Sequence, residues 1–259
     1  MAQLFRKLKR AIFNSDPSFC DMYEDAHARQ AAAEYLGYIR DYLRRAYGDR
    51  KLTILDAGCQ AGRLLIPLAE DGHRLIGVDT SAFALRRTAQ HARERKLAVQ
   101  LHTGNISSIR RWVKPGSLDA VICAEVLYLC KDYQALLKLL ADSLKPGGLI
   151  LASHRPNIFY VATARRRGDE AMAASVLRTS EGPSPDGAYH NWQTEKQLKE
   201  LYASLGLTLL ACAPVDHALF PVNPAAADPD VARLLDTVSR EGAALRVPQY
   251  FLVVASKNE

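Results

Sequence analysis

Residues 52–63 read Leu-Thr-Ile-Leu-Asp-Ala-Gly-Cys-Gln-Ala-Gly-Arg. The apolar run over 52–55 is short, contains β-branched residues and stops near Gly58, which favours a buried strand over a helix. Beyond Gly62, apolar residues recur at positions 64, 65, 68 and 69, which is a helical spacing. The segment therefore predicts a strand, a tight glycine turn and a helix whose N-terminal N–H groups face whatever lies above the turn.

Two classes of cofactor site use such a turn. A dinucleotide site needs G-x-G-x-x-G, but Gln60 and Arg63 occupy the second and third glycine positions here. The segment instead resembles the first motif of the class I S-adenosylmethionine (SAM)-dependent methyltransferases, acidic-x-G-x-G-x-G. Asp56, Gly58 and Gly62 match this motif, and Gln60 departs from it. An α/β protein with a tight turn and no ligand is the alternative reading of this stretch alone.

Three further segments match the same family in the same order. Asp79 ends a second predicted strand, and an acid at this point can accept hydrogen bonds from both hydroxyls of an adenosine ribose. Gly104-Asn105 stands where the family usually has Gly-Asp, and the Asn105 amide oxygen can still accept the adenine amino group. Pro146-Gly147-Gly148 precedes a fifth strand, as is common in the family. The resemblance covers residues 50–155 well and the remainder loosely.

The alternation of strands and helices with short connections predicts a parallel sheet with right-handed crossovers. We expect an α/β fold, a Rossmann-like seven-stranded mostly parallel sheet with helices on both faces and an antiparallel last strand. The sixth and last strands are predicted over 208–213 and 249–255, and a helix after Asp228 is expected to end at Gly242. Residues 1–48 are interpreted as an N-terminal helical segment covering the cofactor site. Residues 49–259 form the methyltransferase domain, with a lid or substrate insertion at about 153–193.

The resemblance also implies a set of cofactor contacts. These are Tyr23, Asp56, Gly58, Gln60, Gly62, Asp79, Thr80, Asn105, Ile106, Ala124 and Glu125. Tyr23 precedes a predicted helix over 26–47, where many methyltransferases of this kind carry a tyrosine that closes over the cofactor; packing at the helix entry is the alternative. The end of the fourth strand, residues 118–125, borders the sulfonium and the acceptor in the family. It lacks the Asn/Asp-Pro-Pro-aromatic motif, which argues against a nucleobase amine as acceptor.

The 153–193 segment is locally similar to ubiquinone-biosynthesis O-methyltransferases, with a His and a Trp before the next helix. Holding the acceptor in line with the methyl group can contribute about 7–11 kcal/mol, whereas a general base adds roughly 3–5 kcal/mol. A base is therefore not obligatory. If the acceptor is a hydroxyl, His154 and His190 are the candidate bases, or else histidines in a polar loop. Arg155 and the run 165–167 face an acidic substrate, a membrane or simply solvent.

Composition bounds the remaining possibilities. The formal net charge of +6 permits an anionic partner without requiring one. No apolar run of about 18 residues predicts a membrane span, and residues 4–13 form a basic amphipathic segment that could lie on a membrane surface or pack on its own domain. The five cysteines have no zinc spacing, so we expect no metal site, free thiols and a cytoplasmic location.

The sequence as a whole predicts a SAM-dependent methyltransferase that acts on a small molecule, more readily at oxygen than at nitrogen, with S-adenosylhomocysteine (SAH) as product. A methyltransferase of protein or RNA is one alternative, although no appended RNA-binding motif is visible. A catalytically inactive methyltransferase-fold partner subunit is the other, because Gln60 and Asn105 depart from the family pattern. No DNA partner is expected.

Overall fold

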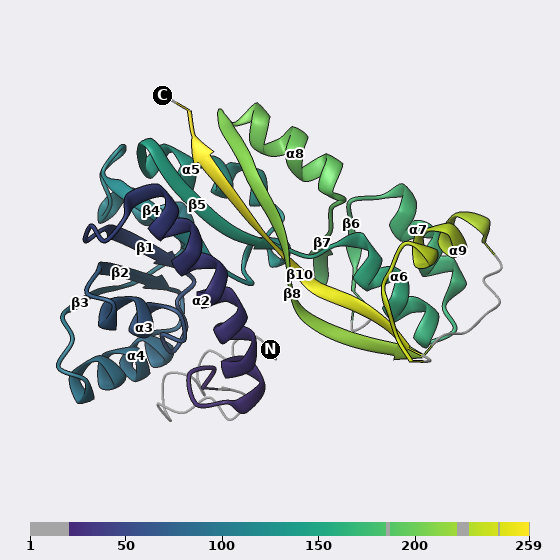
Figure 1. Ribbon diagram of the computed structural model, residues 1–259, viewed down its shortest axis with the longest axis horizontal. Helices are drawn as coiled ribbons and strands as arrows, with labels where there is room; N and C mark the ends of the chain where they lie inside the picture. Colours follow the sequence, from purple (N-terminus) through teal and green to yellow (C-terminus); the bar gives the residue numbers. More distant parts are fainter. Residues whose placement is uncertain (1–20, 185–186, 222–227, 243, 259) are drawn as a thin grey trace, which may run out of the picture.

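Figure 1 shows the computed structural model, which describes residues 21–184, 187–221, 228–242 and 244–258. The basic segment 4–13 and the first 20 residues of the predicted N-terminal region lie outside the described residues. The central sheet has the order β3-β2-β1-β4-β5-β10-β8, with the short β9 paired to β10. The main strands are β1 (Thr53–Ala57), β2 (Arg74–Asp79), β3 (Val99–Thr103), β4 (Leu118–Cys123), β5 (Leu144–His154), β8 (Leu207–Pro221) and β10 (Ala244–Lys257).

The first five strands of the sheet are parallel, and β10 runs antiparallel to both β5 and β8. The predicted sheet, with its antiparallel last strand, is therefore confirmed. The strand order reverses between β1 and β4, and in such sheets ligands bind beyond the carboxyl ends of the strands at this switch point. The fold alone thus indicates where a site should lie.

Helices cover both faces of the sheet (Figure 1). One face packs against α2 (Ala26–Tyr47), α3 (Leu65–Glu70) and α4 (Ala82–Glu94); the other packs against α5 (Tyr133–Ser143), α8 (Glu195–Ser204) and the 3-10 turn η1 (Ile106–Arg111). Ile54 and Leu55 are consecutive in β1, are fully buried, and belong to the two opposite cores. Continuous apolar runs such as 52–55 arise because a parallel strand is buried on both sides.

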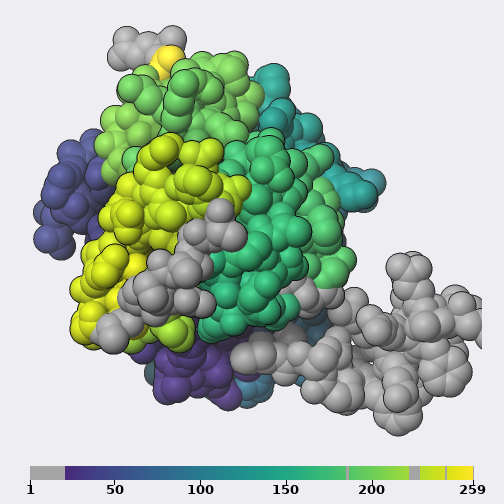
Figure 2. All heavy atoms as spheres, turned by 90° about the vertical axis from the view of Figure 1, so that its right-hand side faces the viewer, coloured from purple at the N-terminus to yellow at the C-terminus, as the bar shows by residue number. Residues whose placement is uncertain are grey.

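A smaller lobe lies at the far end of β8 and β10 (Figure 1). It contains α6 (Asn157–Arg166), α7 (Glu170–Arg178), the hairpin of β6 (Glu181–Pro183) and β7 (Tyr189–Asn191), and α9 (Pro229–Asp236). Viewed end-on, the insertion and the C-terminal segment lie side by side, in agreement with the contacts of α9 with α6 and α7 (Figure 2). Residues from both share a core around Tyr160, Trp192 and Val231.

Three predicted boundaries were wrong in this part of the chain. Strands β8 and β10 are longer than the predicted 208–213 and 249–255 because they pair with each other beyond the central sheet, as far as Pro221 and Ala244. The helix that begins after Asp228 ends at Asp236 and not at Gly242. Residues after it turn back as β9 (Arg240–Glu241), which pairs with β10.

The turn after β1 requires glycine at its first position. Gly58 has a φ of 89°, and its N–H donates to the carbonyl oxygen of Val78 at 2.8 Å. A Cβ on Gly58 would lie 2.3 Å from Cγ2 of Val126. Gly62 has a φ of 90°, and a Cβ there would lie 2.9 Å from Cγ2 of Thr88. Gly62 therefore allows α4 to approach the turn.

We predict that Gly58→Ala destabilises the protein far more than its unusual φ alone explains. Left-handed backbone costs roughly 1–2 kcal/mol in a non-glycine residue, and the overlap with Val126 adds about 1–3 kcal/mol. Gly206→Ala is the matched control, because Gly206 has a φ of 72° with open space around its Cα. Urea unfolding of both variants should show a loss of about 2–5 kcal/mol for Gly58→Ala and roughly 1–2 kcal/mol for Gly206→Ala. Equal losses would contradict the role assigned to Val126.

Candidate functional site

A cavity of about 510 Å³ lies beyond the carboxyl ends of β1, β2 and β4. Its volume is in the range of small-molecule sites, about 300–1,000 Å³. The cavity brings together most of the residues expected to contact the cofactor, namely Asp56, Gly58, Gln60, Asp79, Thr80, Asn105, Ile106, Ala124 and Glu125. Tyr23, Gly62, His154 and His190 do not line it.

Asp79 presents a carboxylate at one end of this cavity. Its two oxygens accept the N–H groups of Gln60, at 2.9 Å, and Ser81, at 2.8 Å. These bonds hold the side chain in place and leave lone pairs on both oxygens, since a carboxylate offers about four acceptor sites. The arrangement fits the two hydroxyls of a ribose, as expected for a SAM site.

Gln60 occupies the middle glycine position of the motif and takes over the backbone conformation that glycine would supply. Its φ is 44°, in the left-handed region. Its side-chain Oε1 accepts the N–H groups of Ala61, at 2.6 Å, and Met22, at 3.3 Å. The Gln60 side chain therefore joins the turn to the segment before α2, which a glycine could not do.

The segment before α2 meets the cavity through Met22 and not through Tyr23. Tyr23 instead stacks on the His91 ring, with 4.3 Å between the centroids, and the guanidinium of Arg95 lies 4.9 Å from the Tyr23 ring centre. The position of Tyr23 is the one that the packing alternative describes, and its closing over a bound cofactor stays a prediction. The Tyr23 ring thus packs on His91 of α4, whereas Met22 lines the cavity.

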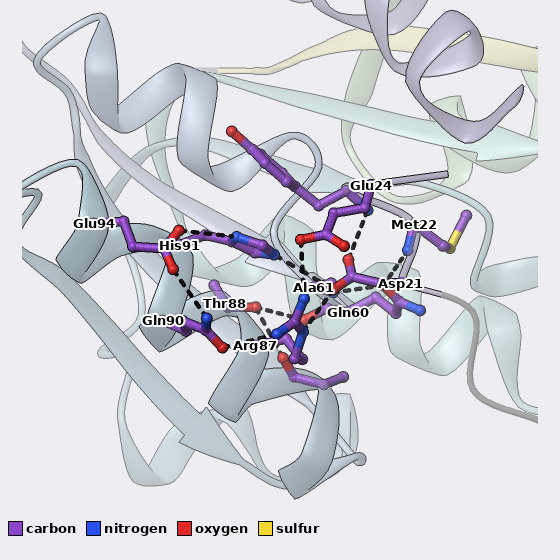
Figure 3. A network of polar contacts seen from close by, with 12 residues as sticks. Asp21, Met22, Glu24, Gln60, Ala61, Arg87, Thr88, Gln90, His91 and Glu94 are labelled. Carbon is purple, nitrogen blue, oxygen red and sulfur yellow. Dashed lines mark hydrogen bonds and ion pairs between the residues drawn. The ribbon is translucent and has the colours of Figure 1, made fainter. Parts of the chain in front are cut away.

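A polar network fixes the same segment to α4 (Figure 3). Arg87 donates from Nε to Asp21, at 2.7 Å, and from Nη2 to Glu24, at 2.9 Å, while His91 Nε2 lies 3.4 Å from Asp21. Burial opposes ionisation of Asp21, but the Arg87 hydrogen bond and the other polar partners outweigh it and lower the pKa of Asp21. Ligand atoms of Asp21, Glu24 and His91 lie within 4.8 Å of one another. Because the Arg87 cation already occupies the two carboxylates, we interpret the cluster as an ion-pair network.

Asn105 and Ile106 border the cavity beside β3. The Asn105 Oδ1 accepts the N–H of Ser107 at 2.9 Å and so caps η1, which leaves the oxygen one further lone pair. Gly104 is needed here because a Cβ on it would lie 2.4 Å from the Trp112 ring. The amide oxygen thus remains able to accept an adenine amino group.

A buried ion pair lies at the exit of β4. Glu125 has a φ of 60°, its N–H donates to Ser153 Oγ, and its carboxylate binds Arg63 Nη2 at 2.5 Å. The two side chains are only 7% and 15% exposed. Burial alone would lower the pKa of Arg63, but the nearby Glu125 carboxylate raises it, so Arg63 keeps its charge. Glu125 was predicted from the sequence, whereas Arg63 was considered only as a departure from the dinucleotide motif.

Asp56 lies fully buried at the base of the cavity. Burial, with a further contribution from the Asp79 charge and against that of Arg63, raises the pKa of Asp56 to about 7. Near neutral pH this carboxyl is therefore divided between its protonated and ionised forms. It can donate a hydrogen bond to a ligand as well as accept one.

The structure does not bring His154 to the cavity. His154 is fully buried, with Nδ1 at 3.2 Å from Gln193 Oε1 and Nε2 at 3.0 Å from the Tyr202 hydroxyl. Tyr202 belongs to α8, so His154 faces the side of the sheet away from α2. Burial lowers the pKa of His154 to about 4, against a smaller upward contribution from Gln193. The expectation that His154 acts as a base is corrected by this position.

His190 lies one aromatic ring away from the cavity. It sits in β7, and its Nδ1 is 2.6 Å from the hydroxyl oxygen of Tyr160. Its ring meets the Tyr128 ring edge-on, with 5.0 Å between the centroids, and Tyr128 lines the cavity. Tyr128 was absent from the predicted site, because its contacts come from segments distant in sequence.

Comparison with known proteins places these features in a family context. Residues 54–148 match a family model described as "Methyltransferase domain". The ubiquinone biosynthesis O-methyltransferase of Methylobacterium sp. (strain 4-46) is 32% identical over 187 residues, which are 67% of this chain and 70% of that protein. The protein of the same name from Idiomarina loihiensis is 33% identical over 118 residues, or 46% of this chain and 47% of that protein. The matched part thus spans about half the length of the latter relative.

Solved structures share the fold at low sequence identity. Magnesium protoporphyrin IX methyltransferase from Synechocystis PCC 6803, solved with bound SAH, has a TM-score of 0.59, 15% identity and full coverage of both chains. The 1,6-didemethyltoxoflavin-N1-methyltransferase of Burkholderia thailandensis, also solved with SAH, has a TM-score of 0.55, 19% identity, and coverage of 100% of this chain and 89% of that chain. Among the described residues, no helix is both long and apolar enough to cross a membrane.

We predict that His154 makes the stability of the protein depend on pH between about 4 and 6.5. The unfolded chain binds a proton at this ring below about pH 6.5, but the folded chain does so only near pH 4. The unfolded state therefore binds more protons in this window, and the free energy of unfolding rises with pH, by about 2 kcal/mol from pH 5 to pH 7. Urea unfolding of wild type and His154→Gln at both pH values should show a smaller rise in the variant. Parallel changes in the two proteins would contradict this account.

Proposed function

The chain belongs to the class I SAM-dependent methyltransferase family, and we propose that it transfers the methyl group of SAM to a hydroxyl oxygen of a small-molecule acceptor. The observation that carries this proposal is the continuity of one cavity from Asp79 to the exit of β4, where Glu125 and Tyr128 line it. One end fits a ribose, and the other is walled by apolar and aromatic side chains. Both halves of a two-substrate site therefore open into the same space.

The chain's own residues supply binding and orientation. When bound, SAM supplies a methyl group on a cationic sulfur, so its transfer to oxygen forms a C–O bond, breaks the C–S bond with the electron pair left on sulfur, and releases the acceptor's proton. Asp79 would accept hydrogen bonds from the ribose hydroxyls, and Asn105 from the adenine. Asp56 would face the cofactor from the base of the cavity, in a carboxyl able to donate or accept.

The residues that follow β4 form a cavity wall that suits a neutral aromatic ring on the acceptor. Val126, Tyr128 and Leu129 line the cavity there, and the only acid of this wall, Glu125, is paired with Arg63. The Asn/Asp-Pro-Pro-aromatic motif of amine methyltransferases is absent from residues 124–128. Oxygen methylation of a phenolic compound is therefore the reaction that this wall supports best, in keeping with the names of the sequence relatives.

We propose that His190 accepts the proton of the acceptor hydroxyl, because His154, the other candidate base, faces α8. His190 contacts Tyr128, and Tyr160 fixes one ring nitrogen through its hydroxyl. Positioning alone contributes about 7–11 kcal/mol to such a displacement, against roughly 3–5 kcal/mol for a base. His190 is thus an aid to a reaction that chiefly depends on alignment.

Calorimetric titration with SAM and SAH tests the cofactor assignment. We expect micromolar binding by the wild type and a loss of about 100-fold in Asp79→Ala, because two hydrogen bonds to a charged acceptor would disappear. Asp71→Ala is the matched control, since Asp71 is an acid at the end of α3 that pairs with Arg40 on the surface. Failure of the wild type to bind SAM or SAH would overturn the enzyme proposal and favour an inactive partner subunit.

Kinetics of His190→Gln test the proton-accepting role. With catechol as acceptor and radiolabelled SAM, we expect the turnover rate to fall by about 10²–10⁴-fold while the affinity for SAH stays unchanged. Tyr160→Phe removes only the hydroxyl that orients His190, so its turnover should fall less. A decrease of under tenfold in His190→Gln would show that transfer proceeds without this base.

A further inference from the structure

Arg155 lies directly after β5, at the ligand edge of the sheet. Its side chain projects among three aromatic rings, with the guanidinium carbon 4.0 Å from the ring centre of Tyr250, 4.3 Å from that of Phe159 and 5.0 Å from that of Tyr128. Tyr128 is the ring that lines the cavity and also meets His190. Arg155 and His190 therefore both contact the Tyr128 ring, although neither of them lines the cavity itself.

The hydrogen-bond partners of Arg155 are all neutral. Nη2 donates to the Tyr250 hydroxyl at 2.7 Å, and Nη1 makes two long contacts, each of 3.3 Å, with the backbone oxygen and Oε1 of Gln249. Nε is buried and has no partner among the described residues. Burial would lower the pKa of Arg155, but the surrounding tyrosines raise it, so the side chain carries its full charge.

The other buried arginines of the described chain have an acidic partner. Arg63 pairs with Glu125, and Arg165 pairs with Glu170. No described carboxylate lies within 4 Å of the Arg155 guanidinium, and the nearby Glu125 is already neutralised by Arg63. Burying a charge without a counter-charge is costly, so the position of the half-buried Arg155 needs an explanation.

A second unsatisfied group lies on the same side. The Tyr35 hydroxyl is buried without a hydrogen-bond partner among the described residues, and its ring centre lies 6.4 Å from that of Tyr250. Both the Arg155 Nε and the Tyr35 hydroxyl can donate a hydrogen bond, and both side chains lie near the Tyr250 ring. Native structures contain few such groups, and each calls for an explanation.

We propose that Arg155 recognises a carboxylate on the acceptor. This proposal rests on the proposed methyltransferase function and specifies the class of its substrate as a phenolic acid. The planar guanidinium matches the two oxygens of a carboxylate. A bound carboxylate would replace the long contacts that Arg155 makes with Gln249. The aromatic part of the same acceptor would lie against Tyr128, which places its hydroxyl on the side of His190. Arg155 is half-buried, and it contacts Tyr128 without itself lining the cavity.

The test compares two probes that differ only in the carboxylate. Titration of SAH-saturated wild type with 3,4-dihydroxybenzoate and with catechol should show about 10- to 100-fold tighter binding of the acid, the range expected for hydrogen bonds to a charged group. In Arg155→Gln this preference should disappear, because both probes then bind with the affinity of catechol. Arg155→Lys keeps the charge and loses the planar fork, so it should retain a preference of only a few-fold.

Controls separate this proposal from the underlying function and from general charge. Arg178→Gln removes an equal charge from the exposed end of α7 and should keep the full preference. SAH affinity is measured in every variant first, and loss of SAH binding in the wild type would overturn the proposed function itself. Normal SAH binding with equal affinities for the two probes, or with no acid binding at millimolar concentration, would overturn only the role of Arg155. Equal weakening of both probes in Arg155→Gln and Arg155→Lys would assign Arg155 a purely structural role.

Discussion

The hydrogen bonds between the turn after β1 and the end of β2 fix the geometry on which the site depends. Gly58 and Cys59 donate to the carbonyl oxygen of Val78, and Gln60 donates to the Asp79 carboxylate. These bonds are possible because the backbone is left-handed at Gly58, where glycine avoids both strain and overlap with Val126. One turn therefore fixes both the Asp79 carboxylate and the backbone that forms the floor of the cavity.

A second link joins the same turn to the strands that carry the acceptor end. Arg63, just beyond the turn, binds Glu125 after β4, and the Glu125 N–H binds Ser153 in β5. Three neighbouring strand ends are thus connected through one buried pair. Removing one member of such a pair leaves an uncompensated buried charge, which typically costs 3–5 kcal/mol. The pair therefore gives the acceptor wall its rigidity while leaving it close to electrically neutral.

Sequence spacing predicted the sheet, and the three strand-end residues that it singled out, Asp56, Asp79 and Asn105, line one cavity in the structure. A strand, a tight turn and a helix leave few positions for such residues. The sequence-based prediction failed where the direction of a side chain changes from one strand residue to the next. Side chains alternate along a strand, so Ser153 faces Glu125 whereas His154 faces Tyr202 of α8. No pattern in the sequence reveals which of the two side chains points toward Glu125 and which toward α8. Tyr128 was missed for a related reason, since its position is set by contacts with distant segments.

The buried Arg63 and the half-buried Arg155 differ in how their charges are balanced, and this difference bears on the proposed specificity. Arg63 is paired with Glu125, so it adds little net charge, whereas Arg155 is bonded only to neutral groups among the described residues. A site built with an unmatched charge discriminates mainly by the cost of leaving that charge unsatisfied when a neutral ligand binds. The aromatic rings around Arg155 lessen this cost in the free protein through cation–π contacts without supplying a counter-charge. The aromatic rings can therefore hold the guanidinium in place in the free protein. A carboxylate of the protein itself would instead compete with the carboxylate of the proposed acceptor.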